Sequence, residues 1–251
     1  MTGKSKNTPL VYGHRGASGE CPENTAAAFA EAWKQEADGI ECDIHLTRDG
    51  ELAVLHDPHT GRIAGRKLVV ADMPWAGLRD LDVGSWKAPR FAAERIPLLR
   101  DVLDALPAGK RILIEVKCGP EAIPPLARLL AARPGLEERV TVMSFNAAVV
   151  AAAATEIPSA LPMLLVDFKQ RDGVWRPSGA QSVADGLACH ARGLGWRCCA
   201  AIDATTVAAA RAAGMTLSSW TVNDPAEARR LADLGLDALT TDWPARIRAG
   251  L

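Results

Sequence analysis

The sequence predicts a closed barrel of eight parallel strands with helices around it, the (β/α)8 or TIM-barrel fold. Short apolar or β-branched runs alternate with Ala- and Leu-rich stretches of helical character along most of the chain. Repeated alternation of strand and helix is typical of a parallel sheet. Eight such strands in 251 residues match the usual size of this barrel, about 250 residues. A doubly wound open sheet is the alternative fold.

The predicted elements follow one another in a regular order. Strands are expected in eight apolar runs, at residues 9–13, 39–44, 111–116, 139–145, 161–166, 196–202, 216–222 and 237–242. Helices are expected between most of them, as at residues 24–37, 120–133, 204–214 and 224–235. Several of these helices open on Asn, Asp or Thr and close on Gly, which are typical capping residues. For the first helix we expect Asn24 or Thr25 as the cap.

One interval departs from this order. Between residues 55 and 111 no run has the character of a buried strand, and only the part after residue 97 resembles the expected helix. We therefore interpret residues 57–96 as an insertion, with Trp75 and Trp86 packed over the barrel mouth or against a partner. A turn at residues 49–52 is expected to fold the next run back as a hairpin. Residues 1–251 then form a single domain.

The composition excludes several classes of function. Lys and Arg number 29 and Asp and Glu number 30, so a net charge of −1 gives no field that attracts nucleic acid or an anionic membrane. The six cysteines have no C-x-x-C spacing, which favours mostly buried thiols in a reducing compartment. No uncharged apolar stretch is long enough to span a bilayer. A soluble, cytoplasmic protein is expected, and its oligomeric state is left open.

Three carboxylates are expected to meet at the carboxyl ends of two neighbouring strands. Glu41 and Asp43 lie two residues apart, so their side chains leave the same face of one strand, and Glu115 follows an apolar run in the next. Like charges this close are costly unless a cation neutralises them. Oxygen ligands favour Mg²⁺ or Ca²⁺ over zinc. The alternative is a set of structural ion pairs with nearby Arg and Lys.

Two histidines and two cations are expected around these carboxylates. His14 ends the first strand, and the hairpin returns His56 to the same rim. Their ordinary pKa, near 6.5, suits general acid and base catalysis. Arg15 and Lys117, together with a metal ion, could bind a phosphoryl group, so the substrate is expected to be a phosphate ester. The other three histidines are interpreted as surface or packing residues: His45, His59 and His190.

Six stretches of the chain resemble one known family. They read HRGASGECPENT at 14–25, GIECDIHLTRDGELAVLHD at 39–57, ERIPLLRDVL at 94–103, LIEVK at 113–117, SSWTVND at 218–224 and TTDWP at 240–244. In this order they resemble the glycerophosphodiester phosphodiesterases. The resemblance implies a TIM barrel with a small insertion after the second strand. It also implies hydrolysis of glycerophosphodiesters to an alcohol and sn-glycerol 3-phosphate.

The resemblance also implies roles for individual residues. Metal ligation falls to Glu41, Asp43 and Glu115, acid and base catalysis to His14 and His56, phosphate contacts to Arg15 and Lys117, and packing against the glycerol moiety to Trp220. From the residues alone, Trp220 fits a core position equally well, and Asp242 is interpreted first as a helix cap and second as a site residue. The loop after His56 reads DPHTGRIAG and departs from the family pattern near the leaving group.

Two other functions remain as alternatives. One is a lysophospholipase D or sphingolipid phosphodiesterase built on the same barrel, for which residues 57–96 would supply an apolar surface. The other is a barrel that binds a phosphate ester without catalysis. The sequence leaves open the preferred head group, the choice between Mg²⁺ and Ca²⁺, which histidine is the acid, and whether water or the glycerol 2-hydroxyl attacks.

Overall fold

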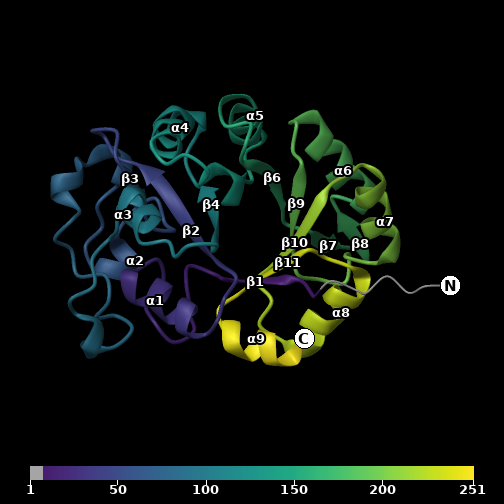
Figure 1. The fold of residues 1–251 in the computed structure, drawn as a ribbon, viewed down its shortest axis with the longest axis horizontal. Coiled ribbons are helices and arrows are strands. Elements are labelled where there is room, and N and C mark those ends of the chain that lie inside the picture. Colours follow the sequence, from purple (N-terminus) through teal and green to yellow (C-terminus); the bar gives the residue numbers. More distant parts are fainter. Residues whose placement is uncertain (1–7) are drawn as a thin grey trace.

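A computed structural model describes residues 8–251 and has eight parallel strands closed into a barrel (Figure 1). In order around the barrel they are β1 (Leu10–Gly13), β2 (Gly39–Leu46), β4 (Arg111–Val116), β5 (Val140–Ser144), β6 (Leu161–Val166), β9 (Gly193–Arg197), β10 (Thr216–Trp220) and β11 (Ala238–Thr241). The barrel closes because β1 pairs in parallel with both β11 and β2. The predicted TIM barrel is confirmed, and the open sheet is excluded.

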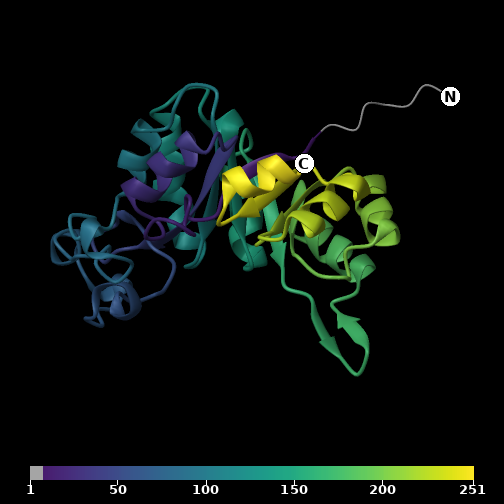
Figure 2. The ribbon, with the colours of Figure 1, turned by 90° about the horizontal axis from the view of Figure 1, so that it is seen from below.

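Helices cover the outside of the barrel, as Figures 1 and 2 show. They are α1 (Ala26–Lys34), α3 (Leu99–Asp104), α4 (Ile123–Ala131), α5 (Ala147–Glu156), α6 (Gly179–Ala188), α7 (Ala204–Ala212), α8 (Pro225–Leu234) and α9 (Pro244–Gly250). Side-chain caps fix where several of them begin. Thr25 accepts a hydrogen bond from the Ala28 amide at the start of α1, and Asp224 accepts one from Ala226 at the start of α8.

The alternation of side chains along each strand separates two kinds of core. Outward-facing residues such as Ile40, Cys42 and Ile44 pack under the helices and are fully buried. Inward-facing residues close the barrel interior with one compact apolar cluster, which consists of Tyr12, Leu113, Met143, Met163, Leu165 and Ala238. The inward-facing residues Glu41 and Asp43 of β2 do not belong to this cluster, and Glu41 is the register partner of Leu113 within it.

The segment between β2 and α3 has a small core of its own. β3 (Leu52–Val54) pairs antiparallel with β2, which confirms the predicted hairpin. The chain then forms α2 (Gly61–Ala64) and three 3₁₀ turns, at Val70–Asp72, Trp75–Gly77 and Pro89–Phe91. Trp75 packs against the apolar residues of this segment, whereas Trp86 is exposed. The interpretation of residues 57–96 as an insertion within one domain stays a prediction.

Two elements differ from the expectation. The strand expected at 196–202 lies earlier, because β9 contains Gly193 and Gly195, whose lack of side chains weakens the strand signal. A Cβ on Gly195 would lie 2.6 Å from Leu165 Cδ2, so a side chain there would displace the end of Leu165. A second hairpin, β7 (Lys169–Arg171) with β8 (Val174–Arg176), projects from the barrel in Figure 2. Its Asp-Gly turn has both residues at positive φ.

Two further expectations concern the cysteines and the membrane. All six cysteines are free, and three of them are buried. Among the helices formed by residues 8–251, none combines the length and the apolar character needed to cross a bilayer.

Candidate active site

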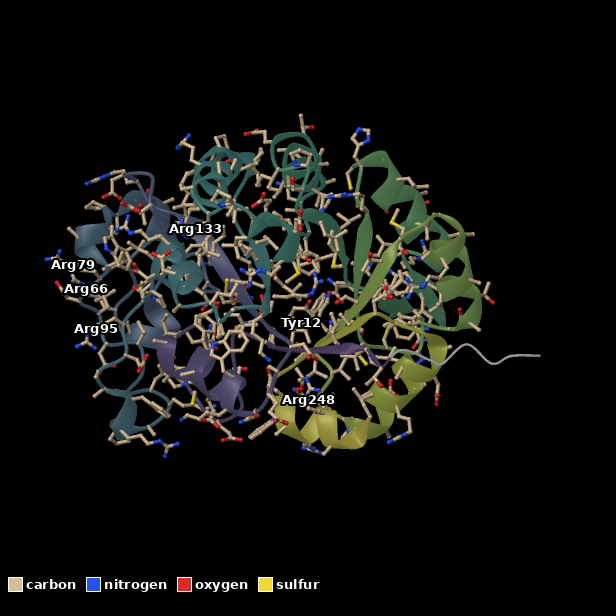
Figure 3. The ribbon with its side chains drawn as sticks, viewed as in Figure 1. Tyr12, Arg66, Arg79, Arg95, Arg133 and Arg248 are labelled. Atoms are coloured by element: carbon tan, nitrogen blue, oxygen red, sulfur yellow. The ribbon has the colours of Figure 1, made fainter. Side chains whose placement is uncertain are left out.

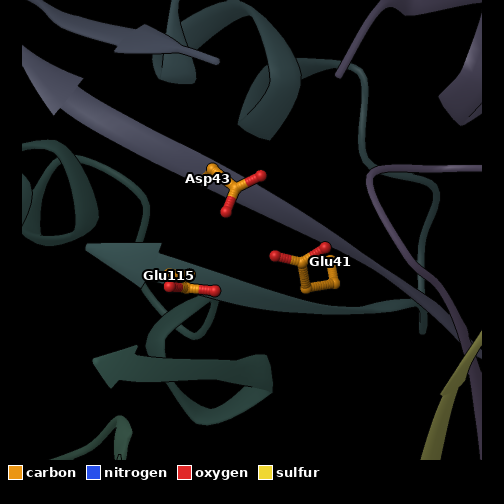
Figure 4. Close-up of side chains that lie close together, drawn as sticks. All are labelled: Glu41, Asp43 and Glu115. Carbon is orange, nitrogen blue, oxygen red and sulfur yellow. The ribbon is translucent and has the colours of Figure 1, made fainter. Parts of the chain in front are cut away.

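Three carboxylates converge inside one end of the barrel (Figure 4). Glu41 and Asp43 come from β2, and Glu115 comes from β4, where it is the direct register partner of Asp43. One oxygen from each of the three lies within 4.8 Å of the others. Glu41 and Asp43 are each only 1% exposed. Period-two alternation along β2 and the parallel register with β4 therefore produce the cluster that the sequence predicts.

The carboxylate oxygens are not fully satisfied by protein groups. Glu41 Oε1 and Asp43 Oδ1 are buried and have no hydrogen-bond partner among the described residues. Burial, followed by the charges of Asp43 and Glu115, raises the pKa of Glu41 well above its usual range. Burial and the Asp43 charge likewise raise the pKa of Glu115, against the opposing effect of Lys117. Unpartnered, mutually repelling oxygens of this kind fit a divalent cation.

Arg15 connects this cluster to the loop after β1. Its backbone N–H donates to Glu41 Oε2 at 2.8 Å, and its guanidinium Nε lies 3.2 Å from Asp43 Oδ2. Burial by itself would raise the pKa of Asp43, but Arg15 and Lys117 outweigh it and hold that pKa below the usual value. Arg15 adopts φ 54°, and the next residue, Gly16, adopts φ 82°. This tight turn directs both the backbone and the side chain of Arg15 toward the carboxylates.

Lys117 connects the cluster to His56. Its Nζ lies 2.7 Å from Glu115 Oε1, 3.7 Å from Asp43 Oδ1 and 3.1 Å from His56 Nε2. His56 Nδ1 lies 2.8 Å from Asp57 Oδ1. An ionised carboxylate only accepts, so the ring proton sits on Nδ1 and Nε2 accepts from Lys117. Burial lowers the pKa of His56 from its ordinary 6.5, which keeps the ring neutral near pH 7.

His14 lies beside the cluster and is held by Asp242, the residue that follows the last strand. Its Nδ1 lies 2.6 Å from Asp242 Oδ1, which also accepts from Ser18 Oγ at 2.9 Å. Asp242 Oδ2 accepts from Asn223 Nδ2 at 2.6 Å. Burial opposes ionisation of Asp242, but the hydrogen bond and charge of His14 outweigh it and lower the pKa to about 2. The bond to Asp242 fixes the ring through Nδ1, and His14 lines the same hollow as Glu41 and Glu115.

Trp220 forms part of the wall of the site. It ends β10, its Nε1 donates to the Gly195 carbonyl at 3.0 Å, and Phe145 packs edge-on against it with ring centroids 5.5 Å apart. Phe145 itself is 46% exposed at the rim. The hollow beside Trp220 has polar and apolar lining residues, which are His14, Glu41, Glu115, Met143, Leu165, Ser218, Trp220 and Thr240. The apolar residues of this lining can thus contact the carbon atoms of a ligand, and the polar residues can contact a charged group.

Comparison with known proteins identifies the family. Residues 14–246 match the glycerophosphoryl diester phosphodiesterase family. The chain belongs to this family. A glycerophosphodiester phosphodiesterase of Caldanaerobacter subterraneus is 32% identical over 240 residues, which cover 94% of each protein. One of Bacillus subtilis is 30% identical over 257 residues and is covered to 84%, against 94% of this chain.

Solved structures agree with this assignment. A phosphodiesterase of Oleispira antarctica in complex with the product sn-glycerol-3-phosphate superposes with a TM-score of 0.84 at 27% identity, over 97% of this chain and 96% of that one. A glycerophosphodiester phosphodiesterase of Agrobacterium tumefaciens has a TM-score of 0.79 at 26% identity, over 96% of this chain and 99% of that one. The protein is therefore an enzyme of the glycerophosphodiester phosphodiesterase class.

The predicted site residues of this phosphodiesterase lie around one end of the barrel, and their roles stay predictions. The remaining histidines have other contacts: His45 Nε2 meets the His56 carbonyl at 3.1 Å, His59 Nδ1 accepts from the Gly61 amide, and His190 is exposed. Of the two interpretations of Asp242, the first, a helix cap, is wrong, and the second, a site residue, stays a prediction. The residue that begins α9 is Trp243, without a side-chain cap, while the carboxylate of Asp242 bonds to His14.

Sequence reasoning also missed three polar residues that support the site. Asn24 was one of two candidate caps for α1, but Thr25 caps the helix, and Asn24 donates to Asp43 Oδ2 at 2.8 Å. Glu23 accepts from Arg15, and Asp57 lies against the ring of His56. The signal available for Asp57 was its place next to a predicted base. For Asn24 and Glu23, it was their place in the turn that carries Arg15.

Proposed function

We propose that this enzyme hydrolyses glycerophosphodiesters to an alcohol and sn-glycerol 3-phosphate with the aid of Mg²⁺ or Ca²⁺. One observation carries the proposal. Buried carboxylates with unpartnered oxygens share a hollow with His14 and are connected to His56 through Lys117, and each histidine is oriented by a carboxylate on its Nδ1. Simple binding of a phosphate ester does not require two oriented histidines, whereas proton transfer to and from a phosphodiester does.

Glu41, Asp43 and Glu115 would hold the metal ion, which suits their hard oxygens and their mutual approach within 4.8 Å. A bound divalent ion supplies Lewis-acid polarisation and charge neutralisation at the phosphoryl oxygens. Arg15 and Lys117 lie beside the same carboxylates and would contact the remaining phosphate oxygens. Burial of Glu41 and Asp43 excludes water and strengthens these contacts.

The two histidines divide the proton transfers. We assign the general base to His56, because its lowered pKa keeps it neutral and its Nε2 already accepts a hydrogen bond. It removes the proton from the attacking oxygen as that oxygen bonds to phosphorus. His14 then donates a proton to the alcohol oxygen as its bond to phosphorus breaks. The attacking oxygen belongs to water, or to the glycerol 2-hydroxyl if a cyclic phosphate forms first and is hydrolysed later.

Trp220 would form the wall against the glycerol carbons. Its ring is partly exposed beside His14 and Glu115, and the hydrogen bond of its Nε1 to Gly195 fixes its orientation. An apolar face next to a cationic site suits a glycerol phosphate, which has carbon at one end and charge at the other.

The test is release of sn-glycerol 3-phosphate from glycerophosphocholine and glycerophosphoethanolamine. We expect release that stops in EDTA and returns with Mg²⁺ or Ca²⁺, and losses of about 10²- to 10⁴-fold in His14→Ala and His56→Ala. Lysophosphatidylcholine in the same assay separates the lipid alternative, and faster turnover of the lipid would replace the proposed substrate. Tight diester binding without turnover under either metal would favour a binding protein and overturn the proposal.

A further inference from the structure

Arg62 lies in α2 and touches two acidic residues that come from separate parts of the chain. Its Nη1 and Nη2 donate to the two oxygens of Glu23 at 2.8 and 2.7 Å, which is a bidentate contact. Its Nε donates to Asp57 Oδ2 at 2.8 Å. One planar guanidinium therefore uses two edges at once, which an ammonium group could not reproduce.

Each of these two carboxylates also holds a residue of the proposed machinery. Glu23 Oε1 accepts from Arg15 Nη1 at 2.9 Å, so the two arginines share this carboxylate. Asp57 Oδ1 lies 2.8 Å from His56 Nδ1. The contacts form a continuous chain in the order Arg15, Glu23, Arg62, Asp57, His56. Its two ends are the phosphate-contacting arginine and the general base.

This chain of contacts restrains the residues at its two ends, Arg15 and His56. Asp57 determines which ring nitrogen of His56 carries the proton, and Arg62 in turn determines where the carboxylate of Asp57 lies. Glu23 draws the Arg15 guanidinium to one side, and Arg62 competes for that carboxylate. Without Arg62, Glu23 would pair with Arg15 alone and Asp57 would be free to turn away from His56.

We propose that Arg62 is a positioning residue that fixes the base His56 and the phosphate-contacting Arg15 relative to each other. The inference rests on the proposed roles of those two residues. With this role, Arg62 connects residues 57–96 to catalysis, because a residue of this segment then completes the geometry of a site built on the barrel strands. Arg62 itself acts through Asp57 and Glu23.

A purely structural ion pair would behave differently. The Arg62 side chain is 42% exposed, so solvent screens its ion pairs, although the bidentate contact with Glu23 stabilises the fold more than an ordinary surface pair does. Loss of the side chain should lower the unfolding midpoint modestly and leave the protein folded at the temperature of the assay. Misplacement of a base and a phosphate contact, in contrast, is costly for a reaction that depends on oriented groups. Activity and stability should therefore separate in the variants.

The experiment compares Arg62→Ala, Arg62→Lys and, as matched control, Arg79→Ala. Arg79 is an exposed arginine of the same segment that, within residues 8–251, pairs only with the adjacent Asp80, and Figure 3 labels it at the outer edge. We expect kcat to fall by about 10- to 100-fold in Arg62→Ala. Because Arg15 is also displaced, KM should rise. Arg62→Lys should recover only a small part of the loss, and the control should match the wild type.

Two further readouts separate positioning from general damage. The imidazole Nδ1–H proton of His56, identified in the NMR spectrum by its absence in His56→Gln, should broaden or shift in Arg62→Ala and remain in Arg79→Ala. The kcat of the double variant Arg62→Ala/Asp57→Asn should be only slightly lower than that of Asp57→Asn alone, because both substitutions break the same chain of contacts.

The outcomes distinguish this inference from the proposed function. If the wild type hydrolyses the diester and Arg62→Ala retains wild-type kcat, KM and His56 signal, the positioning role is refuted while the proposed function stands. Full recovery by Arg62→Lys would also refute it, since charge alone would then suffice. A wild type that releases no sn-glycerol 3-phosphate would instead refute the proposed function.

Discussion

The contact between Asp242 and His14 predicts the effect of one conservative substitution, Asp242→Asn. The two oxygens of Asp242 receive three donors, from His14, Ser18 and Asn223. An asparagine has one acceptor oxygen and one NH₂ group, so on one side its NH₂ group would meet another hydrogen-bond donor and that bond would be lost. A net hydrogen bond to a charged group contributes about 1.5 to 3 kcal/mol. At about 1.36 kcal/mol per factor of ten, its loss reduces kcat by about 10- to 150-fold.

The assay is release of sn-glycerol 3-phosphate at saturating glycerophosphocholine, with the melting temperature measured in parallel. Asp224→Asn is the control, because it makes the same chemical change at the cap of α8. Its kcat should equal that of the wild type. If Asp242→Asn keeps kcat within about two-fold of the wild type, the bond to Asp242 does not orient His14 for catalysis, and the reasoning is refuted.

Three more predictions follow from burial and backbone geometry. Burial and neighbouring charges raise the pKa of Glu41, so the metal-free protein should lose stability as pH rises above the ordinary carboxyl range. Near about pH 8, Glu41→Gln should therefore melt at a higher temperature than the metal-free wild type, and a lower melting temperature would contradict this. Burial lowers the pKa of His56 below 6.5, so the acidic limb of kcat/KM should have its midpoint below that value, and a midpoint above it would contradict the assignment of the base. In Gly16→Ala a new Cβ would lie 2.5 Å from the Ala28 carbonyl carbon, whereas in the control Gly109→Ala nothing lies within 4 Å of the new Cβ. Urea unfolding should show a loss of unfolding free energy of about 1 to 2 kcal/mol for Gly109→Ala and a larger loss for Gly16→Ala; equal losses would contradict the close contact.

The sequence predicted the parts of the fold that depend on local periodicity. Alternation along β2 placed Glu41 and Asp43 on one face, and the parallel order of strands brought Glu115 beside them. Where a strand lacks side chains the same reasoning loses its signal, as at Gly193 and Gly195 of β9. The Asp-Gly turn between β7 and β8 carried a hairpin signal that the strand-and-helix alternation concealed.

The supporting residues of the site were harder to predict. A short polar side chain near the start of a helix can cap that helix or bind a residue distant in sequence, and the local sequence is the same in both cases. Asp242 precedes a helix and Asn24 lies near the start of another, so each has the sequence context of a cap. Their actual partners are distant in sequence: Asp242 contacts His14 across 228 positions, and Asn24 contacts Asp43 across 19. The first pairing depends on closure of the barrel through β1 and β11, the second depends on the parallel pairing of β1 with β2, and no local pattern encodes either.

Closure of the barrel has a consequence for how the enzyme is made. The first strand carries His14, and the carboxylate that orients it follows β11, the last strand of the barrel to leave the ribosome. A nascent chain that already contains Glu41, Asp43 and Glu115 therefore still lacks the contact that orients His14, the proposed acid. Contacts between the two ends of a chain also carry a large loop-closure cost, which slows folding. Hydrolytic activity should consequently arise in a single step near the end of synthesis, and proteolytic fragments that have lost β11 should be inert.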